Sequence, residues 1–374
     1  MRSMAIDRRS LFGSLLAGLV LPPAFAKADA PSRRLYLSAR RTRDGAFRVS
    51  AFTPQGISHL DVPLPGRGHS FALRPDGAVA VHFARRPGRF AKVLDLRDRR
   101  ALGEISTPVG RHFYGHGVFA AEGALLYATE NDYEAERGVV GVYDASAGYQ
   151  RLGELSSHGI GPHDLRLLSD GVTLAVANGG IATRPDLPRV KLNLPTMAPS
   201  LVYLDRRDGR RLEEVRLSPE LHQLSIRHLA VGAGDQVAIA MQYEGPFGDH
   251  VPLVALHRRG SKPLLLDAPK VVLRRMKQYC GSAAFDRSGR VLAVSAPRGN
   301  RLVFWDAEEG QFLSSIELAD GCGIAPAEAP RQFLASSGVG GVVLVEADSG
   351  KAHPLASEFL DGSQWDNHLM AADI

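Results

Sequence analysis

Short apolar runs alternate with polar turns along almost the whole chain. The runs are rich in β-branched and aromatic residues and are bounded by Gly, Pro, Asp or Asn, as strands are. Examples are Ala78–Phe83, Val139–Tyr143, Leu201–Leu204 and Arg301–Trp305. No long stretch carries the 3.6-residue apolar period of an amphipathic helix. The pattern therefore predicts an all-β protein.

One unit recurs along the chain: a histidine or cysteine, then an apolar strand, then an acidic or glycine turn. The seven copies begin at His69, His116, His163, His228, Cys280, Cys322 and His368. The first three begin 47 residues apart, and a four-stranded propeller blade takes about 40 to 50 residues. The repeat predicts a seven-bladed β-propeller.

The two ends of the repeat complement each other. The last copy, from His368 to Ile374, has room for only one strand, whereas the N-terminal part supplies three strands without a first one. Those three are expected at Arg34–Arg40, Phe47–Phe52 and Ile57–Leu64. We expect the C-terminal strand to complete the N-terminal blade, because ring closure pairs the sheet edges that an open array would expose.

The predicted third strand of five blades ends in an apolar residue followed by an acid. These pairs are Leu94-Asp95, Tyr143-Asp144, Leu204-Asp205, Trp305-Asp306 and Val345-Glu346. They resemble the Trp-Asp end of WD repeats, and Gly68-His69 and Gly115-His116 resemble the Gly-His pair of that family. This WD-like pattern is a further indication of a propeller.

The first 26 residues have the plan of a twin-arginine signal peptide. Arg8-Arg9 precede an apolar stretch, Leu11–Leu21, and a small-residue exit, Ala24–Ala26. The stretch is about half of the ~20 residues that a membrane-spanning helix needs, so we expect no stable membrane insertion. An ordinary Sec signal is the alternative. We expect export to the periplasm, cleavage near Ala26, and a mature propeller domain over residues 27–374.

Charge and cysteine content narrow the classes of partner. The formal net charge of +5 includes the arginines of the signal peptide, and the remaining cations are scattered among acids without a basic run. Nucleic-acid binding therefore gains no support. The two cysteines, Cys280 and Cys322, allow one disulfide in an oxidising compartment, and their spacing leaves open whether they pair. We expect a monomer.

The spacing of the repeats predicts that several residues of metal-ligating types lie at one mouth of the central channel. In a propeller the innermost strand of each blade lines the channel, so the starts of these strands form a ring. The candidate metal ligands are His69, His116, His163, His228, His368 and Cys322. Imidazoles and thiolates suit iron, copper or zinc, and a haem is a further candidate cofactor. The alternative is structural: the histidines fix inter-blade turns by hydrogen bonds.

The loops expected at the same mouth are unusually polar. They span Arg85–Arg89, Glu130–Glu134, Asn178–Pro199 and Glu244–His250. The third is a proline-rich insertion that explains the wider, 65-residue interval between His163 and His228, and long loops in compact domains are often functional. The candidate ligand-binding residues are Glu130, Asn131, Asp132, Asn178, Arg184, Asn193, Arg227 and Glu244.

Several longer motifs carry a family resemblance. They are Gly161–Asp164, Ala177–Ile181, Thr183–Asp186, Leu192–Leu194, Met197–Leu201 and Leu224–Leu229. In these motifs the chain resembles exported bacterial propellers catalogued as domain of unknown function fifteen-thirteen, which belong with the quinoprotein amine dehydrogenase β-chain-like propellers. The resemblance implies a role beside imelysin-type proteins in periplasmic iron acquisition. It implies no catalytic residue.

These observations favour a binding protein over an enzyme. We expect a periplasmic propeller that binds a metal, haem or a partner protein through its histidine-lined mouth. One alternative is a metal-dependent, lactonase-like hydrolase that uses Glu130, Asp132 and His163 with a divalent ion. A pure protein-interaction scaffold is another. The chain has no nucleophile elbow, phosphate loop, His-Glu-x-x-His or Cys-x-x-Cys.

Overall fold

Seven antiparallel sheets make up the part of the chain that the computed structural model describes, residues 34–187 and 190–374. The contacts place these residues in one compact unit. The predicted signal peptide lies outside the described residues, so the cleavage site near Ala26 stays a prediction. Among the described residues, no helix is long and apolar enough to cross a membrane.

The N-terminal blade is built from both ends of the described chain. It contains β1 (Arg34–Thr42), β2 (Phe47–Phe52) and β3 (Ser58–Pro63), together with β28 (Ser363–Trp365) and β29 (Met370–Asp373). Both β28 and β29 pair with β1, and Arg34 binds Asp373 across the closure at 2.7 Å. The predicted closure by the C-terminal strand is confirmed. The sequence did not reveal that residues 366–369 interrupt this inner strand.

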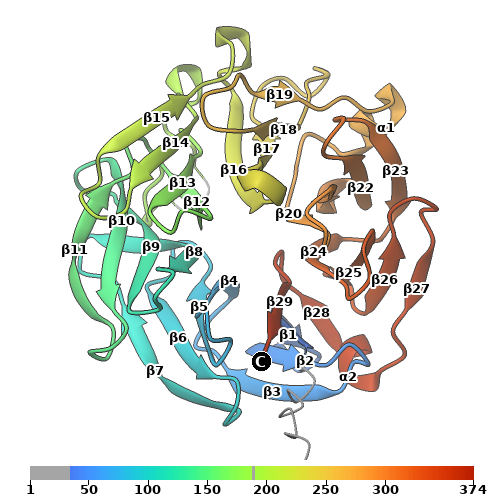
Figure 1. Cartoon of the computed structure of the whole chain (residues 1–374), viewed down its shortest axis with the longest axis horizontal. Helices are drawn as coiled ribbons and strands as arrows, with labels where there is room; N and C mark the ends of the chain where they lie inside the picture. The colour runs from blue at the N-terminus through green and yellow to red at the C-terminus, as the bar shows by residue number, and fades with distance from the viewer. Residues whose placement is uncertain (1–33, 188–189) are drawn as a thin grey trace, which may run out of the picture. The chain divides into compact units, whose positions relative to one another are not determined.

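The other six blades each have four strands in chain order. They are β4 (Gly68–Leu73), β5 (Val79–Ala84), β6 (Phe90–Asp95) and β7 (Arg100–Ser106); β8 (Arg111–Phe119), β9 (Leu125–Asp132), β10 (Arg137–Asp144) and β11 (Gln150–Ser156); β12 (Pro162–Leu167), β13 (Thr173–Asn178), β14 (Ser200–Asp205) and β15 (Arg211–Val215); β16 (Leu224–Val231), β17 (Val237–Tyr243), β18 (Val254–His257) and β19 (Leu264–Leu265); β20 (Ser282–Phe285), β21 (Val291–Ala296), β22 (Arg301–Asp306) and β23 (Phe312–Glu317); β24 (Gly321–Pro326), β25 (Gln332–Ser337), β26 (Val342–Glu346) and β27 (Ala352–Pro354). In Figure 1 the sheets form a ring, with β4, β8, β12, β16, β20, β24 and β29 innermost.

Helical segments are short. Among the described residues, the α-helices are α1 (Lys270–Arg275) and α2 (Glu358–Asp361), and four single 3-10 turns span Leu194–Thr196, Pro219–Leu221, Ala233–Asp235 and Pro297–Gly299. The predictions of an all-β class and seven blades are confirmed.

Burial on both faces explains why the sequences of the central strands are continuously apolar. Every residue of β13 and β21 is buried, because each blade packs against a neighbour on both faces. The outer strand β7 is exposed at every residue except Ile105. The hydrophobic core is therefore divided among the interfaces between blades, and the inner strands are free to present polar side chains to the channel.

The recurrent acid at the end of the third strands stabilises the turn that follows. A carboxylate oxygen of Asp95 accepts the backbone N–H groups of Arg97 and Asp98 at 2.9 and 2.8 Å. Asp144 and Asp306 make the same pair of bonds two and three residues ahead. These are Asx turns, in which a short carboxylate replaces a backbone acceptor. The periodic acid is therefore explained by local turn chemistry.

Candidate metal centre

Five histidines from four different blades and from the closing segment meet in the channel. This histidine ring consists of His69, His116, His163, His228 and His368. Ring centroids are 4.5 Å apart for His69 and His368 and 4.7 Å apart for His163 and His228. The largest of the measured separations is 6.5 Å, between His69 and His228.

Irregular strand pairing occurs where each histidine lies. The register shifts between Gly68 and Phe71 in β4, and β8, β12 and β16 shift around His116, His163 and His228 in the same way. A β-bulge adds an unpaired residue and re-aims a side chain. His368 lies in the break between β28 and β29. By contrast, β20 pairs without a shift and contributes no histidine.

Gly115 is required for the close packing of the ring. Its φ is +105°, and a Cβ built on it would lie 2.5 Å from Cδ2 of His69. A side chain at this position would therefore be strained and would also displace His69. Gly115 precedes His116, so one residue fixes the approach of two neighbouring ring members.

The nitrogen atoms of the ring form two overlapping groups. His69, His116 and His163 offer one ligand atom each within 4.8 Å of one another, and His116, His228 and His368 do the same. His116 is common to both. Five ring nitrogens are buried without a hydrogen-bond partner. One of them, Nδ1 of His69, faces Asp366 at 3.5 Å, and the other four are Nε2 of His116, Nδ1 of His163, Nδ1 of His228 and Nε2 of His368. Buried polar atoms of this kind normally have a partner.

Burial also keeps four of the imidazoles neutral. It lowers the pKa of His69 to about 3, and it lowers the pKa of His163, His228 and His368 well below the ordinary value. Neighbouring histidines act in the same direction, because two imidazolium ions would repel each other at these distances. The neutral imidazole is the form that binds metal ions.

Two buried carboxylates lie next to imidazole nitrogens of the ring. Asp164 Oδ1 lies 3.1 Å from Nδ1 of His116, and Asp366 Oδ1 lies 3.5 Å from Nδ1 of His69. Burial alone would raise the pKa of Asp164, but Arg166 and His116 hold it below its usual range. Asp164 therefore stays ionised and keeps the proton of His116 on Nδ1. This leaves the lone pair on Nε2, as in carboxylate–histidine–metal arrangements.

The structure does not bring Cys322 to the ring. Its thiol donates to the carbonyl oxygens of Trp365 and Ser336 at 3.5 and 3.6 Å. The thiol of Cys280 donates to Leu253 O at 3.6 Å, and burial raises the pKa of both cysteines. The two thiols are free in the structure. Buried neutral thiols are poor ligands.

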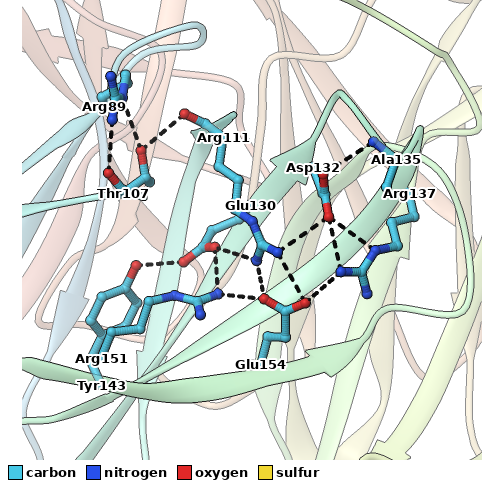
Figure 2. Close-up of polar contacts among 10 residues, drawn as sticks. All are labelled: Arg89, Thr107, Arg111, Glu130, Asp132, Ala135, Arg137, Tyr143, Arg151 and Glu154. Carbon is cyan, nitrogen blue, oxygen red and sulfur yellow. Dashed lines mark hydrogen bonds and ion pairs between the residues drawn. The ribbon is translucent and has the colours of Figure 1, made fainter. Parts of the chain in front are cut away.

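Glu130 and Asp132, predicted at the mouth, belong to an ion-pair network that crosses β8 to β11 (Figure 2). The network consists of Arg111, Glu130, Asp132, Arg137, Tyr143, Arg151 and Glu154. Glu130 is fully buried and accepts from Tyr143 at 2.5 Å and from Arg151 at 3.0 Å. The carboxylates of Glu130 and Asp132 already accept hydrogen bonds from other residues of the network. The geometry therefore gives no support to a hydrolase built from Glu130, Asp132 and His163.

Other predicted ligand-binding residues shape the insertion between β13 and β14. Asn131 donates to Thr183 O at 3.1 Å, and Asn178 donates to Ser157 O at 2.9 Å. Asn193 accepts from Ala182 N at 2.7 Å and donates to Gly180 O at 2.9 Å. Arg184 is exposed and pairs with Asp186 at 3.3 Å. These contacts hold the loop in place, and none of them reaches the ring.

Arg227 and Glu244 do lie beside the ring. With His69, His163 and His228 they line a pocket of about 200 Å³. A larger cavity of about 670 Å³ is lined by residues of β16, β20 and β29 and by His368. The ring therefore borders two cavities.

Several residues of the site were missed from the sequence. Asp164 was visible in the Gly161–Asp164 motif and Arg85 in a polar loop, but neither was assigned to the site. Nothing in the local sequence distinguished Asp366. Its place depends on the break between β28 and β29.

Comparisons with known proteins agree with the fold and assign no reaction. The model of a family described as "Protein of unknown function (DUF1513)" matches residues 62–372. A search of curated proteins found no match. A solved structure titled "Kuenenia stuttgartiensis Hydrazine Synthase" aligns with a TM-score of 0.56 at 14% identity and covers 91% of this chain and 99% of that chain. At this identity the likeness concerns the fold alone.

Proposed function

The chain belongs to the DUF1513 family, whose description assigns no activity, and we propose from the geometry of its site that it binds one transition-metal ion in the histidine ring. The observation that carries this proposal is the set of four buried ring nitrogens without partners, on His116, His163, His228 and His368. A structural role would use these nitrogens in hydrogen bonds. A metal ion would satisfy several of them at once.

The donor set favours a metal that prefers nitrogen ligands. Imidazole suits zinc, copper, iron and nickel, whereas calcium and magnesium prefer oxygen. His116 would serve in either of the two overlapping groups, with His69 and His163 or with His228 and His368. Asp164 would strengthen His116 as a ligand by accepting its other proton.

A single ion fits the ring better than haem does. Several imidazoles lie edge to face, with centroids 4.5 to 5.0 Å apart. A porphyrin is a flat plate that needs an open slot between its axial ligands. The imidazoles that could share an ion pack edge to face at these distances, so a flat plate does not fit between them.

The biological setting rests on the sequence alone. Twin-arginine export, a periplasmic location and a role in iron acquisition with an imelysin-type partner stay predictions. Within that setting a metal-binding propeller would bind iron or copper outside the cytoplasm. Loss of growth under iron limitation after deletion of the gene, restored by wild type and not by the His116→Ala variant, would support the iron assignment.

Metal binding is tested directly with the purified mature chain. The protein is freed of metal, dialysed against iron, copper or zinc in turn, and its metal content is measured by mass spectrometry. We expect one equivalent of at least one metal, and loss of that equivalent in His116→Ala. The matched control is His257→Gln, because His257 is a buried histidine bonded to Tyr203 and Ser261.

Two outcomes contradict the proposal. The first is substoichiometric binding of every metal by wild type. The second is an equal loss of metal in His116→Ala and His257→Gln, which would indicate general destabilisation. Thermal unfolding of the same metal-free samples separates loss of binding from loss of fold.

A further inference from the structure

Five cationic side chains surround the pocket that opens on one side of the histidine ring. The pocket has a volume of about 200 Å³, and its charged lining consists of Arg85, Arg86, Lys191, Arg227, Arg298 and Glu244. We call it the cationic pocket. Its single carboxylate, Glu244, is shared between Lys191 and Arg227. Positive charge therefore exceeds negative charge within the lining.

Arg227 is the strongest sign that the cationic pocket has a ligand. Its side chain is only 10% exposed, and its nearest carboxylate oxygen, on Glu244, is 3.8 Å from Nη2. That separation is too long for a hydrogen bond. Its Nε is buried without a partner. An incompletely compensated buried guanidinium is costly unless something pairs with it.

Two further arginines come from the loop between β5 and β6. Arg85 lies 3.6 Å from Asp366, beyond hydrogen-bonding distance, and its Nη1 is buried without a partner. Arg86 is half-buried, and no carboxylate among the described residues pairs with it. The loop of Arg85 and Arg86 in one blade and strand β16 with Arg227 in another thus bring guanidinium groups to one small volume. Solvated surface arginines have no such common target.

We propose that the cationic pocket binds a small oxyanion, either an organic carboxylate or inorganic phosphate, next to the histidine ring. Guanidinium groups recognise both through paired N–H donors. A pocket of about 200 Å³ has room for an anion of the size of oxalate or phosphate. The proposal depends on the cations and does not require that the ring hold a metal.

The cationic pocket lies directly beside the histidine ring. His69, His163 and His228 form part of the lining of the same pocket. An anion held by Arg227 would therefore lie against the face of the ring and could supply an oxygen ligand to an ion bound there. The neutral imidazoles leave the charge of such an ion uncompensated within the ring.

The test is calorimetric titration of oxalate and of phosphate into the metal-free mature protein at low ionic strength. We expect wild type to bind at least one of them, and Arg227→Met to weaken binding by roughly 10- to 100-fold, as for the loss of a charge-assisted hydrogen bond. The control Arg184→Met removes an exposed cation that lies on the insertion and already pairs with Asp186. It should bind as wild type does. The anion that binds identifies the chemical source.

Each contrary outcome is decisive. The proposal is overturned if wild type binds neither anion, or if wild type and Arg227→Met bind equally well. It is also overturned if Arg184→Met loses as much affinity as Arg227→Met. If Arg227→Met does not fold, Arg85→Met takes its place, since Arg85 is partly exposed. Anion binding that persists in His116→Ala, together with failure of metal binding in wild type, would remove the metal proposal and leave this one standing.

Discussion

The histidine ring and the ion-pair network of β8 to β11 are both buried polar clusters, but they differ in how completely their atoms are partnered. All six carboxylate oxygens of Glu130, Asp132 and Glu154 accept at least one hydrogen bond. In the ring, five nitrogens have no hydrogen-bond partner, and only one of these, Nδ1 of His69, faces a carboxylate. In the network one nitrogen, Arg151 Nε, has none. The network completes its own hydrogen bonds and stabilises the fold, whereas the unpartnered nitrogens of the ring are the atoms that the proposed metal ion would bind.

The two clusters also use glycine differently. A Cβ at Gly141 would lie 1.9 Å from Oε1 of Glu130, so this glycine leaves space for the carboxylate to reach Tyr143 and Arg151. Gly115 instead lets two imidazoles approach without bonding to each other. Gly141 thus makes room for hydrogen bonds to Glu130, whereas Gly115 makes room for two imidazoles whose nitrogens do not bond to each other.

Removing the central carboxylate of the network should have the largest effect on stability. Glu130→Ala leaves Arg151 and Tyr143 without their buried partner, and we expect a loss of about 3 kcal/mol in the free energy of unfolding. Metal content should not change. Urea unfolding measures the loss, with the exposed-pair variant Glu122→Ala as control, where we expect less than about 1 kcal/mol. Equal losses in both variants would mean that the network does not differ from a surface pair.

A side chain at Gly115 should disturb the ring more than the fold around it. Gly115→Ala places a Cβ against His69 at a positive φ, and we expect destabilisation of about 2 kcal/mol. Metal affinity should fall with it, because His69 and His116 would separate. Gly148→Ala is the control, since it has a positive φ and nothing near its Cβ. Unchanged metal affinity in Gly115→Ala would argue against ring geometry as the determinant of binding.

Neutralising the carboxylate behind His116 should weaken the ring without removing a ligand. Asp164→Asn is expected to lower metal affinity roughly 10- to 100-fold, the usual effect of losing such a support. Competition with a chelator measures the affinity at a temperature at which the variant is folded. Asp170→Asn is the control, because Asp170 bonds within its own turn. Wild-type affinity in Asp164→Asn would exclude this role for the Asp164–His116 contact.

The smallest expected effect is the pH dependence that Glu154 of the network contributes to stability. Hydrogen bonding from Arg111 lowers the pKa of Glu154 to about 2, from an ordinary value of 4.5. Since the folded pKa lies below the unfolded one, ionised Glu154 stabilises the fold above pH 4.5, and this contribution disappears as the pH falls toward 2. We expect Glu154→Gln to cost about 1 kcal/mol at pH 7. The difference from wild type in urea unfolding should shrink on acidification, and a constant difference would contradict the assignment.

The sequence by itself determined the architecture. The 47-residue spacing of His69, His116 and His163 located three inner strands. The short C-terminal copy predicted closure on β1, and the acids after the third strands marked their turns. These features depend on local periodicity and on turn chemistry within a few residues, so they can be read along the chain.

Only the tertiary structure decided what the polar residues do. Repeat position treated His116 and Cys322 as equivalent, and the strand register shifts around both. Their surroundings differ, because His116 joins the ring whereas the Cys322 thiol bonds to carbonyls of β25 and β28. Glu130 was expected in a loop at the mouth, yet it lies within β9 and accepts hydrogen bonds from Tyr143 and Arg151. Side-chain direction and hydrogen-bond partners depend on residues far away in the chain. The spacing of the histidines therefore cannot predict them.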